Sequence, residues 1–188
     1  METQLQEILA YNRQFVQDKE YIKYQTDKFP DKKMVIVSCM DTRLTELLPR
    51  ALNLRNGDVK MIKDAGAIVA HPFGSVMRSI IVAIYELGAN EVMVIGHHGC
   101  GMGSINPAAT MEKFKQRGIT DDTITTLRYA GIDLDRWLHG FASVHDSVRN
   151  SVNIIRQHPL IPKDVLVHGL VIDPESGELE VVVDGAQE

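Results

Sequence analysis

Two short apolar runs that are rich in β-branched residues set the fold class of this 188-residue chain. They are residues 34–38 (MVIVS) and 91–95 (EVMVI). Neither run is long enough for a buried helix and neither alternates with polar residues, so each predicts a strand that is covered on both faces. Between them, residues 73–88 carry apolar side chains at the i, i+3, i+4, i+7 positions of a helix that ends at Gly88. Strands that alternate with helices predict an α/β fold with a parallel sheet.

The rest of the chain extends this pattern, and the whole chain is predicted to form a single domain over residues 1–188. Further strands are predicted at residues 59–63, 165–173 and 178–184. Helices are predicted over residues 2–26, 42–52 and, as several short elements, 107–158. The apolar residues expected to supply core in this last region are Leu127, Ile132, Leu134, Trp137, Leu138 and Phe141. The predicted architecture is a mostly parallel central sheet of four strands plus an antiparallel C-terminal edge strand, flanked by helices.

Charge and cysteine content narrow the classes of partner and compartment. The net charge is −5, from 25 acidic and 20 basic residues without a basic block, which argues against nucleic-acid and anionic membrane partners. No apolar run approaches the roughly 20 residues of a spanning helix, and the N-terminus has no basic segment before an apolar one. These features predict a cytoplasmic protein. In a reducing compartment its two cysteines, Cys39 and Cys100, are expected to be free thiols or metal ligands.

Chemically reactive side chains follow two of the predicted strands. Cys39 follows the first strand, and His97-x-x-Cys100 follows the third in a glycine-rich loop. Two thiolates and one imidazole suit a tetrahedral Zn²⁺ ion, and three protein ligands leave a fourth position open for water, as in catalytic zinc sites. Two alternatives stay open: His98 completes a closed site, or the cysteines are small buried residues and His97 is a hydrogen-bonded loop histidine.

Asp41 and Arg43 lie directly after the first of these cysteines. A carboxylate two residues from a metal ligand can reach the open position, where it either binds zinc or accepts a hydrogen bond from bound water. A guanidinium group can hold that carboxylate through two parallel hydrogen bonds. The alternative is a surface ion pair that caps the helix beginning near Thr42.

Together these residues resemble the two signature segments of the β-class carbonic anhydrases. The segments are Cys39-x-Asp41-Thr42-Arg43 and Gly96-His97-x-x-Cys100-Gly101, and the likeness covers residues 33–103. The resemblance implies that Cys39, His97 and Cys100 hold one Zn²⁺ per chain. It also implies that Asp41, held by Arg43, orients a zinc-bound hydroxide that converts CO2 reversibly to bicarbonate and a proton. In the closed, inactive state of such enzymes Asp41 would be the fourth zinc ligand.

One segment departs from the common pattern of that family. Lys63-Asp64 stands where many members have Arg-Asn, and Thr42 stands where Ser is frequent. The added carboxylate is expected to disfavour bicarbonate or to alter proton transfer, for which His98 and His71 are the nearest candidate side chains. The chain is also similar to small members of the class, which implies carbonyl sulfide or carbon disulfide as alternative substrates. A non-catalytic zinc- or redox-responsive binding protein is the alternative from a different functional class.

The resemblance also bears on assembly. In the carbonic anhydrases of this class, N-terminal helices pack across a neighbouring subunit, and residues 2–26 have the amphipathic pattern that such packing needs. The expectation is a homodimer or a higher homo-oligomer.

Overall fold

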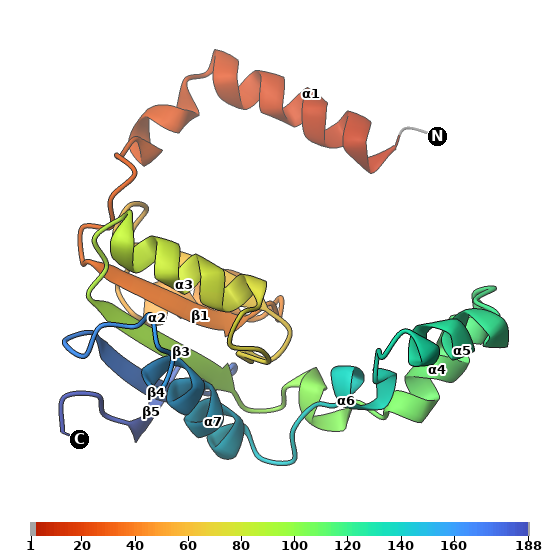
Figure 1. Ribbon diagram of the computed structural model, residues 1–188. Helices are drawn as coiled ribbons and strands as arrows, with labels where there is room; N and C mark the ends of the chain where they lie inside the picture. Colours follow the sequence, from red (N-terminus) through yellow and green to blue (C-terminus); the bar gives the residue numbers. More distant parts are fainter. Residues whose placement is uncertain (1–2, 188) are drawn as a thin grey trace.

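A five-stranded sheet forms the centre of the computed structural model, which describes residues 3–187 (Figure 1). Its strands lie in the order β2-β1-β3-β4-β5. They are β1 (Met34–Cys39), β2 (Val59–Asp64), β3 (Glu91–His97), β4 (Leu166–Ile172) and β5 (Leu179–Val183). The first four are parallel, and β5 pairs with β4 in the antiparallel direction. The predicted α/β fold with four parallel strands and an antiparallel C-terminal edge strand is confirmed.

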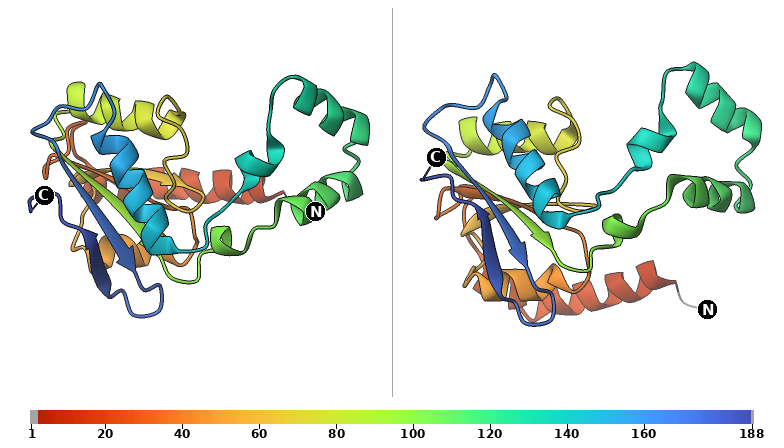
Figure 2. Two further views of the ribbon diagram at one scale, coloured as in Figure 1. Left: turned by 60° about the horizontal axis from the view of Figure 1, so that its bottom comes forward. Right: turned by 90° about the horizontal axis from the view of Figure 1, so that it is seen from below.

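Helices cover both faces of this sheet. Helix α2 (Leu44–Ala51) connects β1 to β2, α3 (Ser75–Tyr85) connects β2 to β3, and α7 (Val144–Arg156) precedes β4. Helices α3 and α7 lie on one face and α2 lies on the other, as the right-hand view in Figure 2 shows. A parallel strand has to be joined to the next by such a crossover, and the crossovers place helices on the sheet faces.

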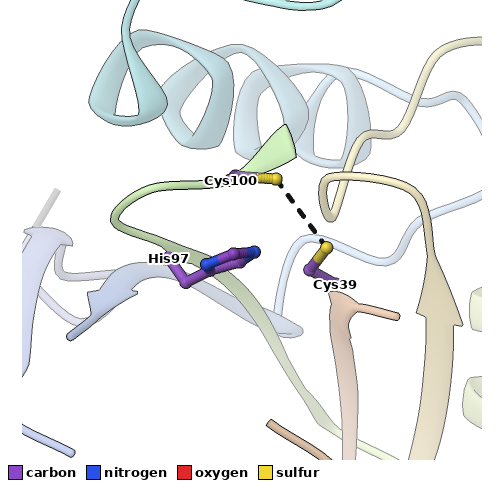
Figure 3. Close-up of side chains that lie close together, drawn as sticks. All are labelled: Cys39, His97 and Cys100. Atoms are coloured by element: carbon purple, nitrogen blue, oxygen red, sulfur yellow. Dashed lines mark hydrogen bonds between the residues drawn. The ribbon is translucent and has the colours of Figure 1, made fainter. Parts of the chain in front are cut away.

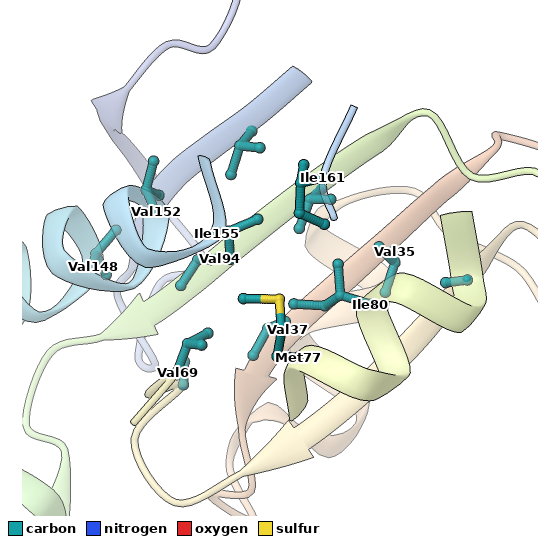
Figure 4. Close-up of a cluster of buried hydrophobic side chains, with 14 of the residues drawn as sticks. Val35, Val37, Val69, Met77, Ile80, Val94, Val148, Val152, Ile155 and Ile161 are labelled. Atoms are coloured by element: carbon teal, nitrogen blue, oxygen red, sulfur yellow. The ribbon is translucent and has the colours of Figure 1, made fainter. Parts of the chain in front are cut away.

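The core therefore has two layers, one on each side of the sheet. Val35 and Val37 of β1 pack toward α3 and α7 (Figure 4), whereas Ile36 packs toward α2. Successive side chains of a strand point to opposite faces, so a strand buried on both faces needs an unbroken apolar run. This requirement explains the sequence of residues 34–38, in which Val35, Ile36 and Val37 are completely buried.

The strand order places the two segments that carry the candidate site residues next to each other. The chain leaves β1 toward β2 on one side and later returns to β3 on the other side of β1. In open α/β sheets ligands bind beyond the carboxyl ends of the strands, at the point where the strand order reverses. Here that point lies between β1 and β3, which end at Cys39 and His97.

The N-terminal region contains two helical pieces, so the single helix predicted over residues 2–26 is wrong in its extent. Helix α1 (Gln4–Gln17) is followed by a short 3-10 helix, η1 (Glu20–Tyr24). Lys19 separates them with a left-handed backbone, φ +57°, which an α-helix cannot continue through. Every residue of α1 is at least partly exposed, because the helix lies away from the sheet (Figure 1).

The second departure concerns the predicted core of residues 107–158. Helices α4 (Pro107–Gln116), α5 (Asp121–Tyr129) and α6 (Leu134–Leu138) form an arm that projects from the sheet (Figures 1 and 2). Its own small core contains Met111, Ile124 and Leu134. The expected core residues Leu127, Ile132 and Trp137 are exposed instead, because the arm that carries them projects away from the sheet. Within the described part of the chain, no helix is both long enough and apolar enough to cross a membrane.

Candidate metal centre

The fold brings the three predicted metal ligands together at the carboxyl end of the sheet (Figure 3). Cys39 ends β1, His97 ends β3, and Cys100 directly precedes the 3-10 helix η2 (Gly101–Ser104). Their candidate ligand atoms all lie within 4.8 Å of one another, and the two Sγ atoms are 3.8 Å apart. In the region covered by residues 3–187, no other such group of three or more His, Cys, Asp or Glu residues occurs. His98 is therefore not a fourth member.

The His97 ring presents one nitrogen to this cluster in the form that binds metal. Its Nδ1 lies 2.8 Å from the carbonyl oxygen of His98. A carbonyl only accepts hydrogen bonds, so Nδ1 carries the proton and Nε2 keeps a free lone pair. Nε2 is buried and has no hydrogen-bond partner among the described residues. A buried polar atom in that condition needs an explanation, and a metal ion held together with the two sulfur atoms would supply it.

The two thiols also fit a bound cation. Burial, with Cys39 close by, raises the pKa of the Cys100 thiol to about 11. Such a thiol stays protonated at neutral pH unless a cation stabilises its thiolate form. Cys39 is buried and accepts a hydrogen bond from the Gly66 backbone N–H at 3.3 Å. Two sulfur atoms and one imidazole nitrogen form the ligand set that Zn²⁺ accepts.

Asp41 is held beside this cluster by Arg43. The guanidinium Nε donates to Oδ1 at 3.0 Å and Nη2 donates to Oδ2 at 2.8 Å, while the Arg43 backbone N–H also donates to Oδ1. These hydrogen bonds hold the pKa of the Asp41 carboxyl far below its usual value. Nη2 also donates to the Gly99 carbonyl, which ties the pair to the loop between His97 and Cys100. One Asp41 oxygen lies 3.7 Å from His97 Nε2, so an ionised carboxylate faces the cluster.

Helix capping explains only part of this geometry. The residue at the N-cap of α2 is Arg43 rather than Asp41, and its side chain makes no capping hydrogen bond. Asp41 does accept the Arg43 backbone N–H, as a turn residue would. Neither a cap nor a turn needs the two hydrogen bonds from the guanidinium group or the short distance between Asp41 and His97.

Asp64, the unusual carboxylate noted in the sequence, ends β2 opposite Cys39 in the strand register. Its Oδ1 accepts from the Ile68 backbone N–H at 3.1 Å, whereas Oδ2 is buried without a partner in the described structure. Burial raises its pKa to about 6. The two candidate proton-transfer residues lie outside the ligand cluster: His98 contacts the His145 ring, and His71 accepts from the Phe73 backbone N–H.

Replacing Asp64 with asparagine is expected to stabilise the metal-free protein at neutral pH. Because the folded-state pKa of about 6 lies above the value of 3.8 for an unperturbed aspartate, the folded state binds the proton more tightly than the unfolded state. Ionised Asp64 therefore lowers the free energy of unfolding. This loss is absent at pH values below 3.8 and complete above about 6. We expect Asp64→Asn to gain about 1–2 kcal/mol at pH 7.5, allowing for partial exposure of the side chain. Urea unfolding at pH 7.5 and 4.5 measures this, and an equal gain at both pH values would contradict it.

The sequence alone does not predict which residues fix the backbone segment that contacts Cys39. Gly66 lies within the residues 33–103 that resemble the family, but no pattern in the sequence singles it out. Ser151 of α7 accepts a hydrogen bond from the Val69 backbone N–H although the two residues are 82 positions apart. No spacing rule connects residues so distant in the chain. The buried position of a serine among apolar neighbours on a helix was the only available signal.

Comparisons with known proteins agree with this geometry. Residues 34–179 match the family model described as carbonic anhydrase. The chain is 60% identical over 181 residues to the Bacillus subtilis protein named "Putative carbonic anhydrase YtiB", covering 96% of this chain and 97% of that protein. A carbon disulfide hydrolase of Acidithiobacillus thiooxidans is 29% identical over 170 residues, with 84% and 76% coverage.

A solved structure extends the similarity to nearly the whole fold. The crystal structure of β-carbonic anhydrase isoform I from Trichomonas vaginalis matches with a TM-score of 0.90 and 31% identity, over 98% of this chain and all of that one. The family model, the sheet order and the extent of these matches lead to one conclusion: the chain belongs to the β-class carbonic anhydrase family.

Proposed function

We propose that this protein is a zinc-dependent carbonic anhydrase that converts CO2 reversibly to bicarbonate and a proton. One observation carries the proposal: an ionised Asp41, held by Arg43, faces a buried cluster of Cys39, His97 and Cys100. The three cluster residues would hold one Zn²⁺ per chain. Three protein ligands would leave one coordination position for water, and the Asp41 carboxylate lies 3.7 Å from Nε2 of His97.

The residues around the ion would each have a separate task. Bound Zn²⁺ would supply a Lewis acid that lowers the pKa of a water molecule. Asp41 would accept a hydrogen bond from that water and direct its lone pair toward CO2. Arg43 occupies both Asp41 oxygens, and therefore keeps the carboxylate ionised and off the metal. The two cysteine thiolates offset the ionic charge and make the water less acidic than three neutral ligands would, so activity is expected to rise with pH.

A related substrate is the second candidate. The carbon disulfide hydrolase relative supports it, because carbon disulfide, carbonyl sulfide and CO2 share a linear structure with an electrophilic central carbon. Asp64 adds a half-buried carboxylate near Cys39, where negative charge disfavours bicarbonate more than it disfavours an uncharged substrate. A zinc- or redox-responsive binding protein is less well supported, since such a protein needs no carboxylate held toward the metal.

Stopped-flow CO2 hydration at pH 7 and pH 8.5, with zinc measured on the same preparation, tests the proposal. We expect one zinc per chain and a higher rate at pH 8.5. One zinc per chain without CO2 hydration, together with turnover of carbon disulfide or carbonyl sulfide, would favour the second substrate class. A protein that binds no zinc after incubation with the ion would contradict the ligand assignment.

We further propose a homodimer in which α1 packs on a second copy. The apolar side of this helix carries Leu5, Ile8 and Leu9, which are all exposed in the single chain. An amphipathic helix of this kind normally buries its apolar side against another surface. The helix makes its main contacts within the chain with η1, so its apolar side remains available to a partner.

Charge on the apolar side of α1 is expected to dissociate this dimer. The mass measured by sedimentation equilibrium is expected to be twice the 21.0 kDa chain mass for the parent protein and one chain mass for the variant Leu5→Lys/Ile8→Lys. The reason is that two lysines cannot be buried unpaired. Gln14→Lys is the matched control, since position 14 lies on the opposite side of the helix at 100° per residue. An unchanged mass for the double variant would rule out this role of α1.

We also propose a cytoplasmic location. Cys39 and Cys100 are free and only 3.8 Å apart, and they have to remain reduced to bind a metal ion. A reducing compartment maintains that state. Substrate would be the small-molecule partner, and the negative net charge gives no support to nucleic acid or a membrane.

A further inference from the structure

The loop over residues 65–74, between β2 and α3, lies against the sulfur atom of Cys39. Its Gly66 backbone N–H donates to Cys39 Sγ, and both groups are buried. The loop reaches this position through a left-handed backbone at Gly66, φ +90°, and at Ala67, φ +55°. A Cβ atom at Gly66 would lie 2.9 Å from the Cγ atom of Met102. The loop backbone is therefore closely packed between Cys39 and the segment that carries Cys100.

Two side chains from different elements fix this loop. Asp64, at the end of β2, accepts the Ile68 backbone N–H through Oδ1. Ser151, in the middle of α7, accepts the Val69 backbone N–H at 3.1 Å, and its side chain is completely buried. The other buried positions of α7 are apolar, namely Val148, Val152 and Ile155. A hydroxyl group at such a site is unfavourable unless it forms a hydrogen bond, and here it satisfies a loop N–H that has no strand partner.

We propose that Ser151, together with Asp64, is a positioning residue that holds the Gly66 N–H on the Cys39 sulfur and so strengthens metal binding. The inference rests on the metal centre of the proposed function. An N–H that donates to a thiolate stabilises its negative charge and fixes the direction of its remaining lone pairs. Groups that orient metal ligands in this way typically change metal affinity 10–100-fold when they are removed. Neither Ser151 nor Asp64 would contact the metal ion itself.

Ser151→Ala is the decisive variant because it removes the acceptor without changing the charge. We expect its Zn²⁺ dissociation constant to rise about tenfold in competition with a chromophoric chelator. In the Co²⁺-substituted protein, we also expect the sulfur-to-metal charge-transfer band to shift. Ser151→Thr keeps the hydroxyl group and is expected to restore most of the affinity and the band position. Ile155→Val, a loss of one methyl group in the same helix, is the control: it lowers stability but leaves zinc affinity unchanged.

Asp64 supplies a second pair of variants if threonine does not pack at position 151. Asp64→Ala removes the acceptor of the Ile68 N–H, whereas Asp64→Asn keeps an oxygen in the same place. We expect zinc affinity to fall more in the alanine variant than in the asparagine variant. The double variant Asp64→Ala/Ser151→Ala should lose less zinc affinity than the product of the two single fold-changes, because both residues hold the same loop.

The outcomes of these measurements distinguish failure of the positioning role from failure of the proposed metal site. Zinc binding by the parent protein, with equal affinity and an unchanged charge-transfer band in Ser151→Ala, would overturn the positioning role alone. Equal losses in the alanine and the conservative variants would do the same, since hydrogen bonding would then not be the cause. Failure of the parent protein to bind zinc would overturn both the metal centre and the positioning role. None of these measurements depends on CO2 hydration.

Discussion

Cys39→Ala, His97→Ala and Cys100→Ala are each expected to abolish stoichiometric zinc binding. Each substitution removes one of three ligand atoms that lie within 4.8 Å of one another, and two remaining ligands cannot hold the ion in a site of this kind. Zinc content after dialysis against a weak chelator measures the loss. The parent protein should retain one zinc per chain, and each variant should retain close to none.

A neighbouring buried polar residue provides the control for this loss. Ser38 precedes Cys39 in β1, is completely buried and donates weakly to the Met61 sulfur atom. Its hydroxyl group contacts Met61 and it is not one of the three residues of the cluster, so Ser38→Ala should keep its zinc. Added Zn²⁺ should also raise the melting temperature of the parent and of Ser38→Ala, but not that of the ligand variants. Full zinc content in Cys100→Ala would remove Cys100 from the ligand set.

Asp41→Ala is expected to keep zinc and lose most CO2 hydration, with kcat/KM falling about 100- to 10,000-fold. Asp41 is outside the Cys-His-Cys cluster, so the metal should stay bound. Its carboxylate is the acceptor that the proposed mechanism needs beside His97. Asp41→Asn tests the same point without removing volume, because the amide presents a donor where the carboxylate presents only acceptors. Stopped-flow rates on preparations of known zinc content give both values.

Glu175 is a useful control for charge alone. It lies near enough to Arg43 to raise the pKa of that guanidinium, although its effect is smaller than that of Asp41. Glu175→Gln should therefore leave the rate of CO2 hydration nearly unchanged.

Because Arg43 holds the pKa of Asp41 far below its usual value, Asp41 stays ionised throughout the assay range. The rise in activity with pH is then expected to come from the water that attacks CO2, and an Asp41→Ala protein of full activity would exclude the Asp-Arg pair from the mechanism.

The sheet and the ligand cluster were predictable because both leave short-range signals. Residues 34–37 and 92–95 are apolar without interruption, which a strand buried on both faces requires. Cys39, His97 and Cys100 follow the ends of two such strands. Parallel strands bring their carboxyl ends to one edge, so these residues could be expected at one site before the strand order was known.

The packing partners of amphipathic helices were not predictable from the same patterns. An apolar stripe indicates that a helix buries one side, but it does not identify the surface that covers it. Trp137 and Leu127 were expected in the core, yet both are exposed in the arm of α4, α5 and α6. The break in the N-terminal helix depends on the left-handed conformation of Lys19. Lysine has no preference for this backbone conformation, so the sequence does not indicate the break. The Ser151 contact depends on tertiary structure alone.

The position of β1 has a consequence for the order in which the molecule opens. β1 is paired on both sides and covered on both faces, so its amide hydrogens should exchange with solvent only when the whole sheet unfolds. The arm of α4, α5 and α6 rests on a core of a few side chains and should open locally at a much lower free energy. Cys39, the first of the three proposed zinc ligands, thus lies in the segment expected to exchange most slowly. Local unfolding or proteolytic cleavage of the arm is therefore expected to leave β1 folded around Cys39.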